Sequence, residues 1–425
     1  MRQVPARGLP SALRALVATL ALTGACTAQA PSAPQAVRPG VDVLLRDSAH
    51  VIAGLRVGLI TNPTGVDAAG RSTIDRLRDH SGVELVRLFA PEHGLRATQG
   101  EGETVLDGTD PISGLPVVSL YGSGKRTPSS EDLAGLDAVI FDMQDIGTRY
   151  FTYVYTMALA MEAAGNEGLR FIVLDRPNPI GGDAVQGNVL DPAFATFVGR
   201  YPIPMRHGMT PGELARLFQD RFGIEVELSV IPVEGWQRTM HFDATGLPWI
   251  PPSPNMPSLE SALHYPGLCL FEGTSLSVGR GTPAAFQQIG APWLDPDQLI
   301  DALAAYDLPG VRFEAVTITP KAATDGKFEG IELPAIRLWT TDRSSYDPTR
   351  TAVALLIETR AQARSRTDSD PWAWNKAHFD RLAGTDQLRI GIETGLSLSE
   401  LTALWSAQRD AFAEARREAL LYGAR

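Results

Sequence analysis

The sequence of 425 residues contains little cysteine, no excess of positive charge and no recognisable metal-binding motif. Its two cysteines allow at most one disulfide and exclude a zinc site built from paired cysteines. Acidic residues outnumber basic residues by 49 to 38, and the formal charge of −11 excludes a broad basic face for nucleic acid. The seven histidines include no HExxH motif and no spaced pair. The sequence therefore predicts neither nucleic acid as a partner nor a metal or other cofactor.

The composition that remains is typical of a globular protein. Hydrophobic residues make up 44% and charged residues 20%, which excludes intrinsic disorder and fibrous repeats. The length is sufficient for two domains, or for one large one, around a buried core. Stability is therefore expected from ordinary packing rather than from cross-links.

The first residues have the pattern of an export signal. Arg2, Arg7 and Arg14 precede the apolar run 15–22, which is too short to span a bilayer as a permanent helix. The sequence LTGAC at 22–26 resembles a bacterial lipobox, so we expect residues 1–25 to be removed and Cys26 to carry lipid. The alternatives are simple cleavage after the AQA sequence at 28–30 and an uncleaved anchor.

These features predict a protein that works outside the cytoplasm. Residues 26–40, rich in Ala, Pro, Gln and Ser, are predicted to form a linker. The expected location is the periplasm or cell envelope, with membrane contact only through the lipid at Cys26. Cys269 then has no disulfide partner and is predicted to be a buried thiol.

Between residues 41 and 235, strand-length apolar runs alternate with amphipathic segments. The runs occupy residues 56–61, 84–89, 116–120, 137–141 and 170–174. They are nearly continuous, as expected of strands buried on both faces of a parallel sheet. Helical patterns fall between them, around 70–80, 129–135 and 151–165. This alternation predicts an α/β fold with a doubly wound, mostly parallel sheet.

The pattern changes in the C-terminal half. A capping box at 210–213 opens a helix to about residue 222, and a strand-like segment, 225–233, follows. The next stretch, 235–295, is dense in Pro and Gly and is predicted as mainly loop. Further helices are predicted at 296–306, at 348–366 and from Ser397 nearly to the end, and strands near 311–319 and 333–340. These elements predict a smaller α+β domain.

Polar side chains follow each predicted strand of the first domain. Asn62 follows the first, Glu92 and His93 the second, Tyr121 the third, Asp142 and Asp145 the fourth, and Asp175 and Arg176 the fifth. Ligands of open α/β sheets bind outside the carboxyl ends of the strands, so these are candidate site residues. The alternative is that Asp and Asn occur here only as turn and helix-cap residues.

Glu92 and His93 are the strongest candidates for acid–base chemistry. They stand between Pro91 and Gly94 at a strand end, where a buried glutamate can donate a proton near neutral pH. The loop that follows adds Glu101 as a further carboxylate. Two alternatives stay open: a metal held by His93 with nearby carboxylates, or a glutamate that only stabilises the turn.

Several arginines stand in rigid loops framed by proline or glycine. They are Arg149, Arg176, Arg206 and Arg280, and Asn178 and His207 lie in the same loops. Because arginine binds carboxylates in a bidentate geometry, these cations suit an anionic substrate group. Internal Asp–Arg pairing is the alternative. The sequence GSGKR at 122–126 fails the spacing of a phosphate-binding loop and does not indicate a nucleotide site.

Longer motifs resemble those of a known family. They are GLITNPTG at 58–65, PEHG at 91–94, residues 141–153, LDRPNPIGG at 174–182, PMRHGMT at 204–210, PPSPNMP at 251–257, FEGT at 271–274, GRGT at 279–282 and FDRLAGT at 379–385. In these motifs the chain resembles the exo-β-N-acetylmuramidase family (NamZ type), long catalogued as a domain of unknown function. The similarity runs from about residue 41 to the end. Two departures, Pro63 and Met143, do not fall on a candidate catalytic group.

The resemblance implies a Rossmann-like catalytic domain, residues 41–235, with its active site in a cleft against a smaller α+β auxiliary domain, residues 236–425. It implies an exo-acting glycosidase that releases N-acetylmuramic acid from the non-reducing ends of peptidoglycan fragments, without nucleotide or metal. The alternatives to this function are a wall-binding lipoprotein without catalysis, and a metal-assisted hydrolase or esterase that uses His93, His207 and the aspartates.

Glycoside hydrolysis uses two carboxyl groups, and the resemblance suggests which ones. Glu92 is the predicted general acid, positioned by His93, and Asp142 or Asp145 is the predicted second carboxylate, with Glu101, Asp175 and Glu272 in reserve. One of Arg149, Arg176, Arg206 and Arg280 is expected to bind the lactyl carboxylate of muramic acid. The full set of predicted substrate contacts is Asn62, Glu101, Tyr121, Arg149, Asp175, Arg176, Asn178, Arg206, His207, Asn255, Glu272 and Arg280.

Overall fold

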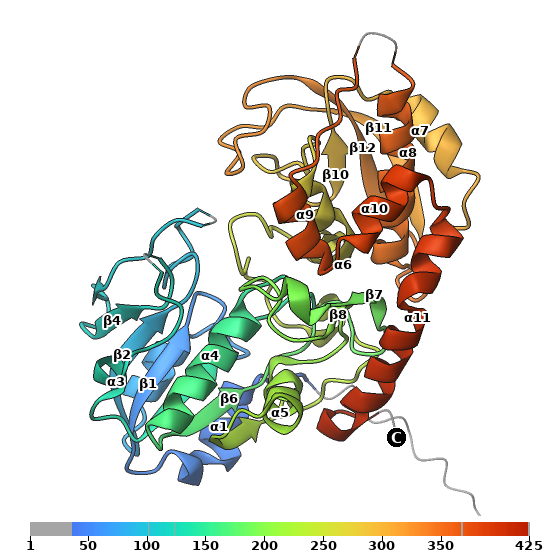
Figure 1. The fold of residues 1–425 in the computed structure, drawn as a ribbon. Helices are drawn as coiled ribbons and strands as arrows, with labels where there is room; N and C mark the ends of the chain where they lie inside the picture. The colour runs from blue at the N-terminus through green and yellow to red at the C-terminus, as the bar shows by residue number, and fades with distance from the viewer. Residues whose placement is uncertain (1–35, 101, 123, 367–368, 424–425) are drawn as a thin grey trace, which may run out of the picture. The chain divides into compact units, whose positions relative to one another are not determined.

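The computed structural model describes residues 36–100, 102–122, 124–366 and 369–423 (Figure 1). Its central element is a seven-stranded sheet with the order β3–β4–β2–β1–β5–β6–β9. The strands are β1 (Arg56–Thr61), β2 (Glu84–Ala90), β3 (Gly108–Thr109), β4 (Pro116–Ser119), β5 (Ala138–Asp142), β6 (Arg170–Leu174) and β9 (Glu227–Ile231). Neighbouring strands are parallel except β3, which is antiparallel to β4. The chain starts in the middle at β1 and extends the sheet first to one side and then to the other.

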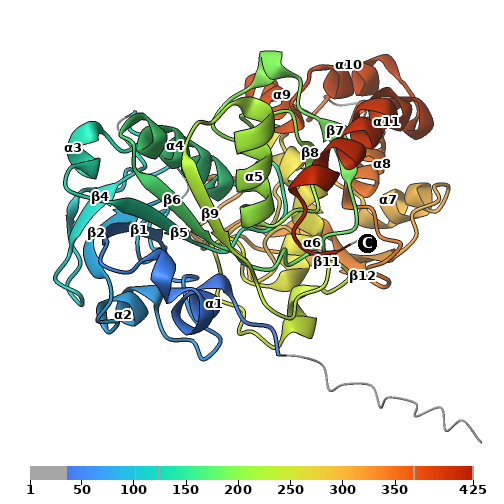
Figure 2. The ribbon, with the colours of Figure 1, turned by 90° about the horizontal axis from the view of Figure 1, so that it is seen from below.

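Helices cover both faces of this sheet, as Figure 2 shows. One face carries α1 (Gly40–Asp47) and α2 (Thr73–Arg78), and the other carries α3 (Ser130–Leu133), α4 (Tyr153–Asn166) and α5 (Pro211–Phe222). Neighbouring residues of β5 show why, since Ile140 lies in one buried cluster with Leu44 of α1 and Phe141 lies in another with Val154 of α4. The predicted doubly wound α/β fold is therefore confirmed.

The apolar runs of the sequence locate these strands closely. β1 and β6 have the predicted bounds, and β2, β4 and β5 differ by one residue at one or both ends. Helix α1 is not predicted, because it directly follows the stretch predicted as a linker. Its first residue, Gly40, lies against β6, where a Cβ would come within 2.5 Å of the Asp175 backbone nitrogen. Only glycine permits this approach, which fixes the start of the helix.

A second, antiparallel sheet with the order β10–β12–β11 lies in the C-terminal part. Its strands are β10 (Gln288–Gly290), β11 (Val311–Ile318) and β12 (Leu333–Thr340), and the helices are α6 (Leu259–Leu268), α7 (Pro296–Leu303), α8 (Pro348–Arg364), α9 (Lys376–Ala383), α10 (Gln387–Thr394) and α11 (Leu398–Ala415). Smaller elements are the antiparallel pair β7 (Gln186–Val189) and β8 (Pro204–Arg206) and the 3₁₀ helices η1 (Ala49–Val51), η2 (Pro192–Phe194), η3 (Phe242–Thr245), η4 (Cys269–Gly273) and η5 (Arg416–Ala419). The predicted strands and the helices α7, α8 and α11 are confirmed, although α7 and α8 end before the predicted residues.

The prediction of 235–295 as mainly loop is wrong at α6. This helix contains Pro266 and Gly267, which local patterns treat as helix breakers. Gly267 is required because α8 passes so close that a Cβ would come within 2.1 Å of the Pro348 carbonyl oxygen. Eight of the ten helical residues are buried, so tertiary packing overrides local propensity here.

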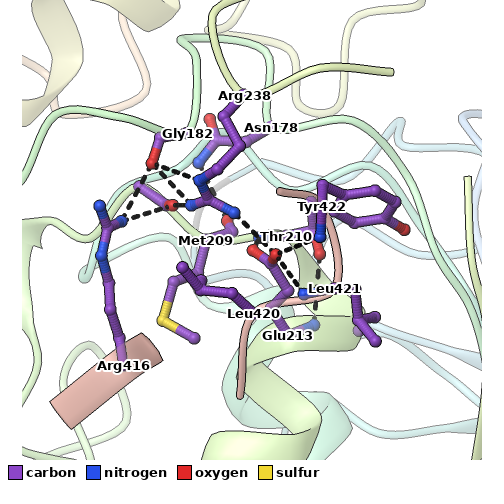
Figure 3. A network of polar contacts seen from close by, with 12 residues as sticks. Asn178, Gly182, Met209, Thr210, Glu213, Arg238, Arg416, Leu420, Leu421 and Tyr422 are labelled. Carbon is purple, nitrogen blue, oxygen red and sulfur yellow. Dashed lines mark hydrogen bonds and ion pairs between the residues drawn. The ribbon is translucent and has the colours of Figure 1, made fainter. Parts of the chain in front are cut away.

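Helix α11 and the residues after it return from the second sheet to the first domain (Figure 1). Figure 3 shows the polar network that holds them. Glu213 of α5 accepts hydrogen bonds from Arg238 Nη1 at 2.7 Å and from the Leu421 backbone nitrogen at 2.9 Å. Arg416 donates to the carbonyl oxygen of Gly182 at 3.0 Å. The residues after α11 are thus tied to α5 and the loops beside the first sheet by charge-assisted hydrogen bonds.

Residues 36–425 form one compact unit, and the predicted domain boundary between residues 235 and 236 stays a prediction. Among the described residues, no helix combines the length and the apolar character needed to cross a membrane. The predicted signal, Cys26 and most of the predicted linker lie outside the described residues, as does Glu101.

Candidate active site

A pocket of about 210 Å³ lies at the carboxyl ends of β2 and β4. One wall consists of the residues that follow these strands and the start of α4, and the other consists of segments from 253–286 and α9. The predicted site residues that the pocket brings together are Glu92, His93, Tyr121, Asn255, Glu272 and Arg280. The pocket therefore joins residues far apart in the sequence into one candidate site.

Glu92 follows β2 directly and is buried, with 5% of its surface exposed. Its Oε2 accepts a hydrogen bond from the Thr152 hydroxyl at 2.7 Å, and its Oε1 accepts one from the Gly102 backbone nitrogen at 3.3 Å. Both donors are uncharged. Burial, followed by the neighbouring carboxylate of Glu92, raises the pKa of Tyr121, so this hydroxyl keeps its proton. Among the described residues, the hydrogen bonds that orient this carboxyl group in the pocket come from uncharged donors.

His93 adopts the left-handed backbone region, with φ at 68°, and Gly94 follows with φ at 76°. A non-glycine residue in this region costs about 1 kcal/mol, and such strain is concentrated at functional sites. The Nδ1 of His93 lies 2.9 Å from the carbonyl oxygen of Gln99. Because a carbonyl oxygen only accepts, Nδ1 carries the proton of the neutral ring. The strained turn and this hydrogen bond fix the imidazole beside Glu92.

Glu272, in η4, is the second glutamate of the pocket. Burial alone would raise its pKa, but the charge and hydrogen bond of the Arg280 guanidinium hold the pKa below the usual range. The Arg280 Nη1 also donates to the Thr324 hydroxyl at 3.2 Å, as does the Asn255 amide nitrogen. Glu272 is therefore an ionised carboxylate at neutral pH, held by the Arg280 guanidinium.

The backbone that carries Glu272 is held from behind by Lys327. Its Nζ donates to the carbonyl oxygens of Glu272 at 3.2 Å, Thr274 at 2.9 Å and Leu276 at 2.9 Å. Cys269 is buried, as predicted, and its Sγ lies 3.6 Å from Glu272 Oε2. The ammonium group therefore acts as a fixed centre for the turn around η4.

Asp142 and Arg176, both predicted site residues, pair with each other below the surface instead of lining the pocket. Arg176 Nε donates to Asp142 Oδ1 at 2.6 Å, and the Thr73 hydroxyl donates to Oδ2. Their side chains are 0% and 5% exposed. This is the internal Asp–Arg pairing that the sequence analysis left open.

Asp145 and His207 form a second buried pair, with 3.7 Å between Asp145 Oδ2 and His207 Nε2. Burial raises the pKa of Asp145 to about 7. Burial, followed by the charges of nearby arginines, lowers the pKa of His207 to about 3. The imidazole is therefore neutral at physiological pH, and the pair lies away from the pocket wall.

The remaining predicted residues also have internal partners. Arg149 donates to the Asn188 and Leu382 carbonyl oxygens, Arg206 to the Gln186 side chain, and Asn178 to the Met209 carbonyl oxygen, while Asn62 accepts from Thr64 and Asp175 accepts from Thr210 and Gly212. None of them belongs to the described lining of the pocket. Their role in substrate binding stays a prediction, and their contacts here are those of structural residues.

Some lining residues have no place in the sequence-based set. Arg126, Phe197 and Arg381 belong to the pocket. Arg126 lies in the GSGKR sequence that fails as a phosphate-binding loop, Arg381 lies in the FDRLAGT motif, and Phe197 had no signal. Within the described ranges, no group of three or more His, Cys, Asp or Glu side chains is placed to hold a metal ion.

Comparison with known proteins places this geometry in a family. The family models described as exo-β-N-acetylmuramidase NamZ, N-terminal and C-terminal, match residues 57–260 and 263–422. The peptidoglycan β-N-acetylmuramidase NamZ of Bacillus subtilis (strain 168) is 42% identical over 386 residues, which cover 91% of each chain. A crystal structure of a DUF1343 family protein from Bacteroides fragilis NCTC 9343 matches with a TM-score of 0.84 and 34% identity, covering 91% of this chain and 99% of that one. A second such protein matches with a TM-score of 0.72 and 28% identity, covering 92% and 100%. The chain belongs to the exo-β-N-acetylmuramidase NamZ family.

Proposed function

We propose that this protein is an exo-acting glycosidase that releases N-acetylmuramic acid from the non-reducing ends of peptidoglycan fragments. Membership of the NamZ family and the 42% identity to a peptidoglycan β-N-acetylmuramidase support this activity. The observation that carries the proposal is a single pocket in which Glu92 and Glu272 face the same space from two different parts of the chain. Glycoside hydrolysis needs such a pair of carboxyl groups.

The two glutamates have different environments, and the roles follow from this difference. Glu92, hydrogen-bonded only to neutral donors among the described residues, is the general acid that protonates the leaving oxygen. Glu272, kept ionised by Arg280, is the second carboxylate, which faces the positive charge that develops on the sugar ring. This assignment replaces Asp142 and Asp145, which the sequence favoured, because both are buried against internal partners. His93 positions Glu92.

The test is the release of free muramic acid from a disaccharide with muramic acid at the non-reducing end. Residues 26–425 are incubated with this substrate with and without EDTA, and the product is measured by mass spectrometry. We expect stoichiometric release that EDTA does not reduce. Binding without release would contradict the enzymatic proposal and favour a wall-binding protein, and loss of release in EDTA would favour a metal-assisted hydrolase.

The location of the protein is a separate proposal that rests on the sequence of residues 1–26. The three arginines, the short apolar run and the LTGAC sequence support export to the periplasm or cell envelope and lipidation of Cys26. The Cys26→Ser variant is expected to move from the membrane fraction to the soluble fraction of the envelope. Wild-type protein found soluble, with an N-terminus after Ala30, would contradict lipidation while leaving export intact.

A further inference from the structure

Arg126 is a cation in the pocket whose hydrogen-bonding capacity is not satisfied within the described part of the protein. Its guanidinium carbon lies 3.9 Å from the centre of the Tyr121 ring and 4.5 Å from that of Phe197. Its Nη1 is buried and has no hydrogen-bond acceptor among the described residues. A buried guanidinium nitrogen without an acceptor is unfavourable, so this geometry indicates a ligand that supplies one.

The other arginines of the pocket have acceptors or anionic partners. Arg280 pairs with Glu272, and Arg381, which is exposed, donates to His378 Nδ1. The arginines proposed from sequence, such as Arg149 and Arg176, are occupied by carbonyl oxygens or by Asp142. Arg126 is therefore the pocket cation best placed to receive an anion from outside.

We propose that Arg126 binds the carboxylate of the lactyl ether on the terminal muramic acid and so determines the preference for this sugar over N-acetylglucosamine. This inference rests on the proposed function and names the residue behind its substrate specificity. The two sugars differ only in that ether, so discrimination requires a group that reads its negative charge.

The two aromatic rings make Arg126 suitable for this role. Cation–π contacts with Tyr121 and Phe197 hold the guanidinium in place, and its Nη1 has no acceptor among the described residues. A carboxylate accepts two parallel hydrogen bonds from the edge of a guanidinium. Tyr121 and Arg126 line the same pocket as Glu92, so the anion site lies in the same space as the general acid. Binding of the lactyl group would therefore place the glycosidic bond near Glu92.

The experiment measures binding of free N-acetylmuramic acid by calorimetry, which does not depend on catalysis. Arg126→Gln keeps the length of the side chain and removes its charge, and we expect about a 10- to 100-fold rise in Kd. Binding of N-acetylglucosamine and of the lactyl methyl amide of muramic acid is expected to be weak in the wild type and unchanged in the variant. The matched control is Lys125→Gln, which removes a charge from the same loop at a residue that pairs with Asp132 outside the pocket. It is expected to leave Kd within about twofold.

An unchanged Kd in a folded Arg126→Gln variant would overturn the inference, as would equal losses in the Arg126 and Lys125 variants, because general electrostatics would then suffice. Equally tight binding of the methyl amide would also overturn it, since a neutral group would be recognised as well as the carboxylate. If Arg126→Gln melts at a lower temperature, Arg126→Lys replaces it, and a loss of sugar preference is expected there too because the bidentate edge is gone. Release of muramic acid by the wild type, measured separately, tells a failure of this inference from a failure of the proposed function.

Discussion

Two neighbouring stretches of one sheet edge carry the same kinds of side chain and end in different environments. At the ends of β2 and β4, Glu92 and Tyr121 line a pocket of about 210 Å³. At the ends of β5 and β6, Asp142 and Arg176 are buried, and segment 242–250 covers the edge so that a space of only about 20 Å³ is left. Acidic side chains and arginines follow the strands in both places. What differs is the segment that covers them.

The difference shows what decides whether such a carboxylate is available to a substrate. In the covered stretch the charges of Asp142 and Arg176 match each other, because an unpaired buried charge costs several kcal/mol. In the open stretch Glu92 has neutral donors only, and Arg126 keeps a nitrogen without an acceptor among the described residues. The pocket therefore contains polar groups whose hydrogen bonds a ligand can complete. In the covered stretch, Asp142 and Arg176 bind each other instead.

The largest effect on catalysis is expected in the pocket, when Glu92 is replaced. Glu92→Gln keeps the shape and the hydrogen bond from Thr152 but removes the proton that the leaving group needs. We expect a loss of about 10³-fold in kcat, the usual contribution of a general acid, with the melting temperature little changed. Release of muramic acid from a glycoside with a poor leaving group is the measurement. A glycoside with a very good leaving group should be much less affected, and similar losses on both would speak against the acid role.

Substitutions in the covered stretch should lower the stability of the protein and leave catalysis nearly unchanged. Asp142→Asn leaves the Arg176 guanidinium buried without its anion, so we expect a loss of about 3 kcal/mol in the free energy of unfolding. Turnover per folded molecule should stay within a few-fold of the wild type. The measurement is urea unfolding beside active-site titration.

The control for Asp142 is the double variant Asp142→Leu with Arg176→Met, in which both charges are removed. Much of the lost stability should return, because apolar residues of similar size replace buried ion pairs well. A catalytic loss in the double variant as large as that of Glu92→Gln would break the comparison and return Asp142 to the site.

The sequence was sufficient for the sheet, and it put Glu92 first among the glutamates and Glu272 only in reserve, through the resemblance to a family. Continuous apolar runs locate β1 and β6 because strands buried on both faces need such runs. The rule that ligands bind at carboxyl ends of strands then selects Glu92. It selects Asp142 equally, because the rule describes the edge of the sheet and not what covers it. That cover, residues 242–250, comes from a loop whose position depends on long-range packing.

Glu272 and Arg126 could not be derived from local patterns for the same reason. Glu272 reaches the pocket because α6 packs against α8, through a glycine approach that local propensity counts as a break, and η4 packs against α6 and α9. Arg126 lies in the GSGKR sequence, which does not have the spacing of a phosphate-binding loop. Its proposed role depends on contact with Phe197, a residue 71 positions later in the chain. Only the assembled structure brings these residues together.

Lys327 offers a smaller test of the open site, through the backbone that carries Glu272. Lys327→Met keeps the stem of the side chain and removes the ammonium that holds four carbonyl oxygens in and after η4. As a positioning residue it should lower kcat by about tenfold and leave KM nearly unchanged, because a small displacement of Glu272 affects the transition state most. Lys321→Met, at an exposed residue on the same segment, is the control. A rise in KM at constant kcat would assign Lys327 to substrate binding instead.

A further effect concerns the second buried pair and appears only as pH is varied. Burial raises the pKa of Asp145 from 3.8 to about 7, so between these values the folded protein binds a proton that the unfolded chain has lost. The stability that Asp145 contributes is therefore present at low pH and is lost as pH rises toward 7. Asp145→Asn removes this dependence, and the variant should gain on the wild type by at most about 1.4 kcal/mol per pH unit.

Urea unfolding of both proteins at roughly pH 4, 5, 6 and 7 would measure this difference, because these values span the titration of a buried carboxyl group. His207, with its pKa lowered to about 3, is present in both proteins, so its own contribution largely cancels when the two are subtracted. A difference that stays flat with pH would mean that Asp145 is ionised in the folded protein, as a carboxylate with a charged partner or with access to water would be. Asp145 would then be charged in the folded protein, unlike a carboxyl group that is buried without a cation. It would belong to the open stretch of the sheet edge instead of the covered stretch.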